Sequence, residues 1–408
     1  MAVTRTNELG DSRLEVMSAE YDYSVPKNYI YSQSPLAVVP AGGVISGKGN
    51  GFSSLRIPSY HRLLPAPSTR AEDTDIAAVQ LLDSAVTINP SLYGNAVQLG
   101  YKVQRESAID VFQVAAKLVA ENAAESIDYI ARSAAVAGTA FEFGLGSSRD
   151  QQTGASPLTP GMLFNAAGYL QSAPKLPGGP GMGMGSGIAA IMRNAVIADL
   201  AENSSIILLG QYRDSAPETV LLGEVGSHIN GVRLIVSDYA KIFHGAGSTL
   251  VISSGATKSA VSAGDTTVNV ETSLSSAAAL GYMCLGVVES TANGEQTNVE
   301  TVFINAASTA MTVRGGAPNG GLVYSYSSAA PLTGRRQVHA VVFFGANALM
   351  KVHDTDSGEN GKPLFPVVDG LLEQFDSLSW RWFGGFGRWA ENRLYRVEVG
   401  AARQVLGI

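Results

Sequence analysis

The chain has 408 residues, enough for two or three domains. Hydrophobic residues make up 45% of it, as in ordinary globular proteins, but charged residues make up only 15%, against a usual share of about 25%. A surface so poor in charge is a solubility risk for a monomer. We therefore expect much of the surface to be buried against other copies. A compact monomer with a very large core is the alternative.

Charge and cysteine content argue against several functional classes. The net charge is −7 and no basic block occurs, which argues against sequence-reading nucleic-acid binding. The single cysteine, Cys284, excludes an intrachain disulfide and fits a reducing compartment. The sequence has no run of eighteen apolar residues and no apolar secretory core near its start. These features predict a soluble protein that is made in a cytoplasm.

Residues 1–50 show neither helical nor strand periodicity, although they carry several tyrosines and aliphatic residues. Pro26, Pro35 and Pro40 keep this stretch extended. A segment with apolar anchors but no fold of its own usually lies along another surface. We predict an N-terminal arm that crosses its own subunit and a neighbour; an irregular N-terminal lead is the alternative.

Residues 51–105 are typical of a long β-hairpin loop. Phe52–Leu63 forms the outgoing strand, and Ser84–Ile88 together with Ala96–Val103 forms the return. The tip, from Pro65 to Asp75, has polar turn chemistry. A hairpin this long has too little core to stand alone in water, so we expect it to need a partner surface.

Residues 106–140 predict one long helix, about 45 Å in length. Ser107, three residues before Asp110, resembles a capping box, and neither Pro nor Gly interrupts the pattern up to Ala137. Gly138 is expected to end the helix at positive φ. The apolar stripe has i, i+3 and i+4 spacing and contains Val111, Ala115, Leu118, Asn122, Val119, Ala123, Ile127, Ile130 and Ala134.

Residues 141–247 and 335–378 predict a mixed α+β domain. Thr159-Pro160 begins a helix whose apolar face holds Leu163, Ala166, Ala167 and Leu170. Further elements are expected in chain order: helical periodicity over Ile188–Leu200, strands over Val232–Val236 and Val338–Phe344, and a short helix around Ala346–Lys351.

Residues 248–334 differ in sequence pattern from the segments on either side, and we predict an inserted small all-β sandwich or barrel. Short β runs alternate with Gly, Ser, Asn and Asp turns at roughly ten-residue spacing. The runs are Thr249–Ile252, Thr266–Val270, Tyr282–Val288, Val299–Ile304, Ala310–Val313 and Leu322–Tyr326. Residues 379–399 then supply two aromatic-rich closing strands, which we group with the long helix in a peripheral domain. The fold class is therefore α+β with a β insert.

Sequence patterns typical of active sites are absent or incomplete. Gly42–Lys48 has the spacing of a phosphate-binding loop, but Gly49 occupies the Ser or Thr position. Gly183–Gly187 misses the dinucleotide pattern, and Glu224 with His228 is more typical of a solvated loop. The five histidines are scattered (His61, His228, His244, His339, His353), and Cys284 lies in a predicted strand as a packed small hydrophobe. We predict no catalytic, cofactor-binding or metal-binding residue and no enzymatic activity.

Three stretches, in this order, resemble the major capsid proteins of tailed bacteriophages, which have the Hong Kong 97-type or Johnson fold; the similarity points in particular to the branch typified by phage N-four. The first runs from Leu92-Tyr-Gly-Asn-Ala-Val through Asp110-Val-Phe to Glu125-Ser-Ile-Asp128. The second runs from Leu222-Gly-Glu-Val-Gly through Gly231-Val-Arg-Leu to Ala240-Lys-Ile-Phe-His-Gly. The third is Val341-Val-Phe-Phe-Gly-Ala-Asn-Ala with Ser379-Trp-Arg-Trp-Phe-Gly and Arg393-Leu-Tyr-Arg-Val-Glu-Val.

The resemblance implies a structural protein whose hexamers and pentamers close into an icosahedral shell around packaged double-stranded DNA. Residues 1–50 would be the arm, 51–105 the extended loop, 106–140 the spine helix, and 141–247 with 335–378 the axial domain. It also implies a separate scaffolding protein, a portal, loose non-specific DNA contact and no membrane, with or without a decoration protein. The protein would reside in the virion after assembly in the host bacterial cytoplasm.

Two other functions remain open at this stage. An encapsulin-type compartment shares the fold but encloses enzymes instead of a genome. A surface-binding protein or hydrolase built on the β insert would be a monomer or a small oligomer with a defined pocket.

Overall fold

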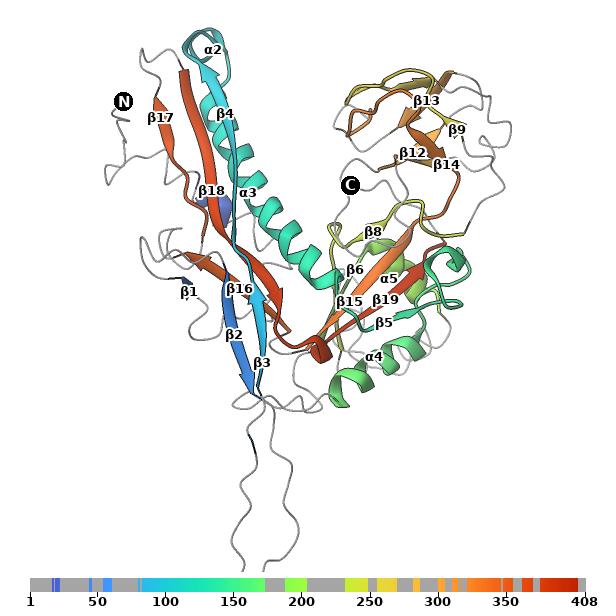
Figure 1. The fold of residues 1–408 in the computed structure, drawn as a ribbon. Coiled ribbons are helices and arrows are strands. Elements are labelled where there is room, and N and C mark those ends of the chain that lie inside the picture. The colour runs from blue at the N-terminus through green and yellow to red at the C-terminus, as the bar shows by residue number, and fades with distance from the viewer. Residues whose placement is uncertain are drawn as a thin grey trace, which may run out of the picture. The chain divides into compact units, whose positions relative to one another are not determined.

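The computed structural model describes residues 17, 19–22, 44–45, 54–60, 80, 83–172, 188–203, 232–248, 255–269, 282–286, 300–304, 310–314, 317, 321–345, 348–354, 362–369 and 375–402 (Figure 1). The chain forms two compact units, each assembled from segments that are far apart in sequence. The first unit comprises residues 1–134, 171–186 and 346–393, and the second comprises residues 135–170, 187–345 and 394–408.

The first unit is built around the long strand β18 (Phe375–Arg388). β18 pairs with β16 (Leu349–Asp354), β17 (Val367–Asp369) and β4 (Ser91–Gly100), and β1 (Val44–Ile45) adds to β16. A separate antiparallel pair joins β2 (Leu55–Tyr60) to β3 (Asp83–Ile88). Two helices follow β4, namely α2 (Tyr101–Glu106) and α3 (Val111–Val136). Figure 1 shows β4 and β18 side by side, with α3 running along them.

The buried face of α3 consists largely of alanines. Buried pairs recur every four residues from Ala115 to Val136, and Ile127 is fully buried. Small side chains allow a helix to approach its neighbours closely. The predicted apolar stripe is confirmed at Ala115, Val119, Ala123 and Ile127, whereas its last members, Ile130 and Ala134, are half-buried. It is wrong at Leu118, whose side chain is 57% exposed.

The two ends of α3 differ from those predicted. The strand ends at Gly100 and a separate six-residue helix follows, so the long helix begins only after Asp110. The Asp110 side chain accepts a hydrogen bond from the Gln113 N–H at 3.1 Å and serves as the N-cap. Ser107, the predicted cap, instead accepts from the Ile109 N–H at 3.2 Å. Gly138 does not have positive φ.

The second unit contains a sheet in the order β5 (Phe141–Phe143), β19 (Leu394–Gly400), β15 (Val338–Phe344), β6 (Ile188–Met192) and β7 (Val232–Val236), with β8 (Ile242–Phe243) also paired to β15. All seven residues of β15 are buried. Apart from His339 the strand is apolar, as is typical of a strand covered on both faces. Helices α4 (Pro160–Ser172) and α5 (Asn194–Ala201) belong to this unit, and so does a 3-10 turn at Arg149–Gln151; a second such turn, Glu391–Arg393, lies in the first unit.

A buried ion cluster stabilises the sheet of the second unit. Glu398 on β19 accepts two hydrogen bonds from Arg149, at 2.6 and 2.7 Å, and lies 2.9 Å from the Nε of Arg396. Arg396 also donates to the carbonyls of Val136 and Gly138, which places a cation at the C-terminal end of α3. A buried carboxylate flanked by two guanidinium groups is compensated only while both partners are in place.

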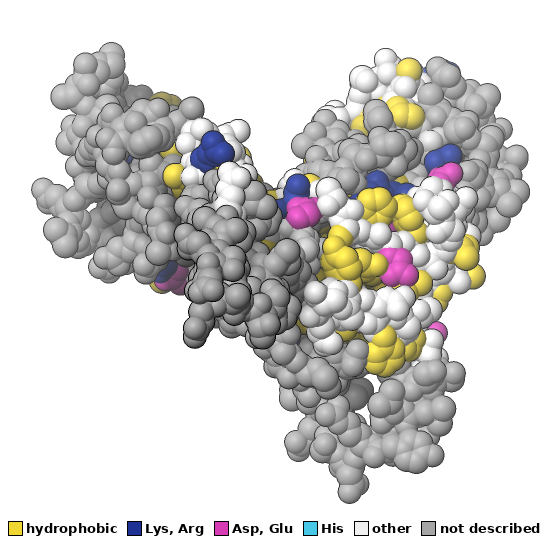
Figure 2. All heavy atoms as spheres, turned by 60° about the horizontal axis from the view of Figure 1, so that its bottom comes forward, with side chains coloured by type: hydrophobic (Ala, Val, Ile, Leu, Met, Phe, Trp, Pro, Cys, Tyr) yellow, Lys and Arg dark blue, Asp and Glu magenta, His cyan; other side chains and the backbone are white. Residues whose placement is uncertain are grey.

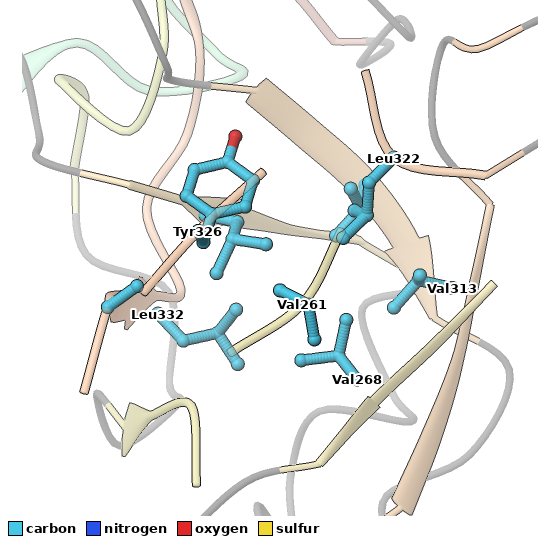
Figure 3. Close-up of a cluster of buried hydrophobic side chains, with 9 residues drawn as sticks. Val261, Val268, Val313, Leu322, Tyr326 and Leu332 are labelled. Atoms are coloured by element: carbon cyan, nitrogen blue, oxygen red, sulfur yellow. The ribbon is translucent and has the colours of Figure 1, made fainter. Parts of the chain in front are cut away.

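Residues 255–333 contribute a second sheet to this unit, in the order β10 (Thr267–Asn269), β13 (Ala310–Arg314), β12 (Glu300–Ile304), β11 (Tyr282–Leu285), β14 (Pro331–Thr333) and β9 (Gly255–Ala256). Its core is shown in Figure 3 and includes Val261, Val268, Val313, Leu322, Tyr326 and Leu332. The two chain ends of this region are joined: the Gly247 N–H donates to Arg336 at 2.9 Å, and the Arg336 N–H donates to Ser248 at 3.2 Å. A sandwich or barrel form for this sheet remains a prediction.

Several predicted elements need correction. The helical pattern over Ile188–Leu200 divides into strand β6 and helix α5. The short helix predicted around Ala346–Lys351 is wrong, because Leu349–Asp354 forms β16, which is antiparallel to β18. Ala96–Val103 does not return along the hairpin, since β4 pairs with β18. Leu322–Tyr326 is not a strand.

Hydrogen bonds to a buried carboxylate explain why Leu322–Tyr326 does not form a strand. Glu300 accepts hydrogen bonds from the Val323 N–H, the Tyr324 N–H and the Tyr326 hydroxyl, at 3.1, 3.3 and 3.1 Å. These bonds replace the strand ladder that the sequence pattern predicts.

The β runs at Thr266–Val270, Tyr282–Val288, Val299–Ile304 and Ala310–Val313 each contain an observed strand, whereas Thr249–Ile252 lies outside the described residues. The described face of α4 agrees with the prediction at Leu163, Ala166, Ala167 and Leu170. Within the described part of the chain, no helix combines the length and apolar character that crossing a membrane requires.

Candidate assembly surface

The first unit carries most of the large hydrophobic side chains that are exposed in the described residues. Leu92 is 70% exposed and Ile109 is 69% exposed. The set also contains Val97, Tyr101, Val103, Val114, Leu118 and Phe375. We call these eight side chains the β4–α3 surface. Most of them lie within one stretch of sequence, from β4 through α2 to the first turns of α3. Monomeric proteins rarely expose apolar side chains at this density, so the surface is a candidate for contact with another chain.

Asn122 anchors α3 to the sheet beneath this surface. Its side-chain oxygen accepts hydrogen bonds from the Trp380 indole N–H at 2.9 Å and from the Asn95 amide at 3.2 Å. Asn95 and Trp380 are direct partners in the β4–β18 register. The helix is therefore tied to both strands at one point, and the exposed side chains around it are presented on a fixed framework.

The tip of the first unit, at α2, has no buried residue. The Phe375 ring lies within 4 Å of the position that a Cβ on Gly100 would occupy, and Arg105 donates a hydrogen bond to the Tyr101 hydroxyl at 3.1 Å. Gln104 donates to Asp376 at 2.9 Å, which links α2 back to β18. Two aromatic rings are thus held in place at the tip, and each remains about half exposed.

The free edge of β4 lacks the usual protection against pairing with another chain. Among the described strands, β4 pairs only with β18. Exposed edge strands in monomers are commonly protected by Lys, Pro or an inward-pointing charge. The ten residues Ser91–Gly100 contain no charged residue and no proline. The Ala96 N–H donates to the neighbouring Asn95 side chain at 2.8 Å.

The β2–β3 pair is rooted in the first unit by a small apolar cluster. Ile88 packs with Met350 and Val352, and Leu55, Val86 and Trp389 lie against them. A Cβ on Gly387 would come within 2.6 Å of Ile88, so the glycine lets β3 lie directly on β18. The described part of the hairpin has its core at this root, and residues 61–79 lie outside the described part.

Two pieces of the predicted N-terminal arm also pack in the first unit. The Tyr21 ring lies 5.8 Å from the Phe365 ring, and Asp22 forms an ion pair with Lys362 at 2.8 Å. Burial raises the pKa of the Tyr21 hydroxyl above its usual range, and the nearby Asp22 and Asp128 carboxylates add to this. Val44 and Ile45 run parallel to β16. The arm therefore contacts its own subunit, as expected. Its contact with a neighbouring subunit stays a prediction.

Of the residues considered for chemistry, His244 and Cys284 are near neighbours, because the Thr301 that His244 contacts is the cross-strand partner of Cys284. His339 is fully buried in β15, His244 lies 2.9 Å from the Thr301 hydroxyl, and His353 is in β16. Cys284 is buried in β11, which confirms its interpretation as a packed small hydrophobe. Among the described residues, no group of three His, Cys, Asp or Glu side chains could hold a metal ion. His61, Gly183–Gly187, Glu224 and His228 lie outside the described residues, as does the Gly42–Lys48 loop apart from β1.

Comparison with known proteins gives a result for the fold alone. No family model matches the chain, and no curated protein matches it. Solved phage capsid structures do match. The capsid of Ralstonia phage GP4 aligns with a TM-score of 0.53 at 9% identity, covering 99% of this chain and 96% of that chain.

Two cyanophage capsids agree with this match. The capsid structure of cyanophage P-SCSP1u has a TM-score of 0.53 at 12% identity, over 91% of this chain and 88% of that chain. The capsid asymmetric unit of cyanophage Pam1 has a TM-score of 0.50 at 13% identity, over 87% of both chains. The chain therefore has the α+β Hong Kong 97-type fold of phage capsid proteins, as its sequence resemblance implied.

Proposed function

We propose that this chain is the structural major capsid protein of a tailed bacteriophage. In this proposal it assembles as hexamers and pentamers into an icosahedral head around double-stranded DNA. The observation that carries the proposal is the fold itself, which is shared with solved phage capsids over at least 87% of each chain in all three comparisons. The protein acts as a building block, and we infer no enzymatic activity for it.

The β4–α3 surface supports this proposal because a shell subunit needs large surfaces that other copies cover. Eight large apolar side chains have exposed fractions between 38% and 70% and would be in contact with water in a free subunit. Covering these side chains with neighbouring copies would account for their exposure.

The remaining parts of the proposal follow from the same assignment. Residues 1–50 act as an arm and 51–105 as an extended loop that overlap neighbouring subunits. The rest of the first unit, with α3, β16, β17 and β18, acts as the peripheral domain, so the predicted grouping of 379–399 with the long helix holds for β18 and not for β19. The second unit acts as the axial domain, with 248–334 as a β insert. The expected partners are a separate scaffolding protein and a portal, with or without a decoration protein. The net charge of −7 favours loose, non-specific contact with DNA.

The test is electron microscopy of the purified full-length protein, alone and co-expressed with a scaffolding protein. We expect closed particles tens of nanometres wide that carry no enzyme cargo, and in infected cells we expect the chain in the virion. Particles filled with a cargo enzyme would replace the proposal with an encapsulin-type compartment. Monomers or small oligomers in every condition would contradict a shell-forming role.

A further inference from the structure

Lys351 lies in the sheet of the first unit, at the third position of β16. Its direct partner across the sheet is Phe386 on β18, and its side chain is half-buried. Lysine is seldom withdrawn from water unless an acidic side chain accompanies it. A role as a structural building block requires no amine at this place in the sheet.

The alternation of β18 places Lys351 on the face of the sheet that packs against α3. Trp380, Trp382 and Phe386 are separated by even numbers of residues, so their side chains share one face of the strand. The Trp380 indole on that face donates a hydrogen bond to Asn122 of α3. Because Lys351 is opposite Phe386 in the register, it belongs to the same face, which agrees with its partial burial.

Aromatic rings line the position of the Lys351 amine. Its Nζ lies 5.9 Å from the centre of the Trp382 ring, which is fully buried. Tyr93 stacks on Trp382 with 5.9 Å between the ring centres, and the Phe386 ring lies at the same distance from it. An aromatic ring attracts an ammonium group through its quadrupole, but it replaces only part of the water that burial removes.

The register surrounds Lys351 with neighbours that carry no carboxylate. On its face of the sheet these neighbours, opposite, diagonally across and along its own strand, are Phe386, Gly384, Arg388, Leu349 and His353. Arg388 is itself a cation and pairs with Glu391 at 2.6 Å. Within the described residues, the ion pairs do not include Lys351. Its charge is therefore not compensated by any acid that the structure describes.

The other described lysines have more ordinary surroundings. Lys102 pairs with Glu106 at 3.8 Å, and Lys362 pairs with Asp22 at 2.8 Å. Of the remaining three, two are exposed and one is buried, namely Lys117, Lys258 and Lys241. On the side of the molecule seen in Figure 2, Lys and Arg side chains come to the surface at isolated points, with Asp and Glu side chains among them. Lys351 differs in being half-buried among aromatic rings.

Burial without an acidic partner favours the neutral form of an amine. It lowers the pKa of Lys351 from 10.5 to about 8. At pH 8 about half of such amines are neutral, against about one in 250 for a lysine with the usual pKa of about 10.4. The neutral amine is the nucleophilic form, and desolvation is a recognised way to activate a lysine.

We propose that Lys351 is a nucleophilic amine and the preferred acylation site on the described part of this chain, with compounds that carry an activated acyl group as its reaction partners. The ammonium group first releases a proton to water. The nitrogen lone pair then attacks the acyl carbonyl, the bond to the leaving group breaks, and the nitrogen loses a second proton to solvent. The amide that remains is neutral, which suits a half-buried position beside Trp382 better than an ammonium group does.

The experiment measures acetylation of the full-length wild-type protein by a limiting amount of N-succinimidyl acetate, the activated acyl compound used as probe. Mass spectrometry of proteolytic peptides gives the acetylated fraction of each lysine between pH 6 and pH 11. Lys102, exposed on α2, is the internal control. A free lysine-containing peptide in the same solution corrects for hydrolysis of the reagent.

We expect Lys351 to react about tenfold faster than Lys102 at pH 8, since its weaker basicity and partial burial offset part of the gain in neutral amine. Its rate should level off above pH 8, while that of Lys102 still rises beyond pH 10. A Lys351 that reacts no faster than Lys102, with a rate that also rises beyond pH 10, overturns the inference. The capsid function is tested separately by particle formation and does not depend on this result.

A pair of variants tests the cause of the reactivity. Phe386→Glu places a carboxylate opposite Lys351, and Phe386→Gln places a neutral group of the same shape there. Once thermal unfolding shows that both are folded, we expect Phe386→Glu to react at Lys351 about tenfold more slowly than Phe386→Gln at pH 8, because the carboxylate holds the amine charged. Equal rates would contradict the proposed basis. If either variant does not fold, the wild-type pH profile alone decides.

Discussion

Strands β15 and β4 show two different ways in which this chain treats apolar residues. All seven residues of β15 are buried, between β19 on one side and β6 with β8 on the other. Of the ten residues of β4, only Leu99 is buried. The chain itself pairs with β15 on both edges and buries its side chains. By contrast, β4 is paired on one edge only, and its apolar side chains are exposed to water. Stability of the free subunit therefore depends on regions such as β15, and the β4–α3 surface is available for assembly.

The sharpest test of this distinction lies within α3, where Ile127 is fully buried and Leu118 is 57% exposed. Ile127→Asp places an unpaired charge in the core, at a cost of several kcal/mol, and we expect no soluble folded subunit. Leu118→Asp is the matched control and should change stability by less than about 0.5 kcal/mol, while it blocks assembly. Soluble expression and thermal unfolding measure both. Wild-type yield of Ile127→Asp would show that the helix register is wrong.

Glu398→Gln tests the ion cluster of the second unit. The substitution leaves Arg149 and Arg396 buried without their counter-charge, and we expect the free energy of unfolding to fall by about 3–5 kcal/mol. Glu106→Gln is the control, because the Glu106–Lys102 pair on α2 is exposed and worth at most about 1 kcal/mol. Urea unfolding of the two variants at neutral pH gives the comparison. Equal losses in the two variants would contradict the importance of the buried cluster.

The burial of His339 in β15 allows us to predict how folding stability depends on pH. Burial, with the charge of Arg193 as a second cause, lowers its pKa from 6.5 to about 3, and neither ring nitrogen has a hydrogen-bond partner among the described residues. Below pH 6.5 the unfolded chain takes up a proton that the folded chain does not. Stability is therefore fully present above pH 6.5 and decreases by about 1.4 kcal/mol per pH unit towards pH 3.

His339→Val removes this group and should flatten the acid dependence. Between pH 7 and pH 5, we expect wild type to lose about 2 kcal/mol more than His339→Val, as measured by urea unfolding at each pH. Carboxylates elsewhere titrate equally in both proteins and cancel in the difference. Identical pH profiles would show that His339 is protonated without cost in the folded chain.

Asn122→Ala is expected to have the smallest effect of the set. It leaves the buried indole N–H of Trp380 without its acceptor, which should cost about 1–2 kcal/mol in unfolding experiments. Gln98→Ala, on the exposed part of β4, should change stability by less than about 0.5 kcal/mol. A loss no larger than that of Gln98→Ala would mean that α3 does not depend on this anchor.

Local signals explain what the sequence predicted well. Thr159-Pro160 and the spacing of Leu163, Ala166, Ala167 and Leu170 specify α4 within thirteen residues, and the alternation in β18 and β19 needs no distant information. By contrast, the local pattern predicts a short helix around Ala346–Lys351, because the pairing of Leu349–Asp354 with β18 is not visible in it. The two closing strands look alike in sequence, yet β18 belongs to the first unit and β19 to the second.

The assembly surface was harder to predict from sequence than the core. Leu118 fits the apolar stripe of α3 as well as Ile127 does, because spacing alone cannot distinguish a face covered by its own sheet from one that another chain would cover. A signal was present in composition, since the buried face is rich in alanine whereas Val114 and Leu118 are larger.

The most direct test of the central claim is a cryo-electron microscopy reconstruction of the assembled particle at side-chain resolution. We predict that Leu92, Ile109 and Leu118 lie in contacts between copies, with the free edge of β4 covered. A closed shell in which these side chains face solvent, or a protein that forms no shell and stays monomeric with its scaffold present, would contradict the account.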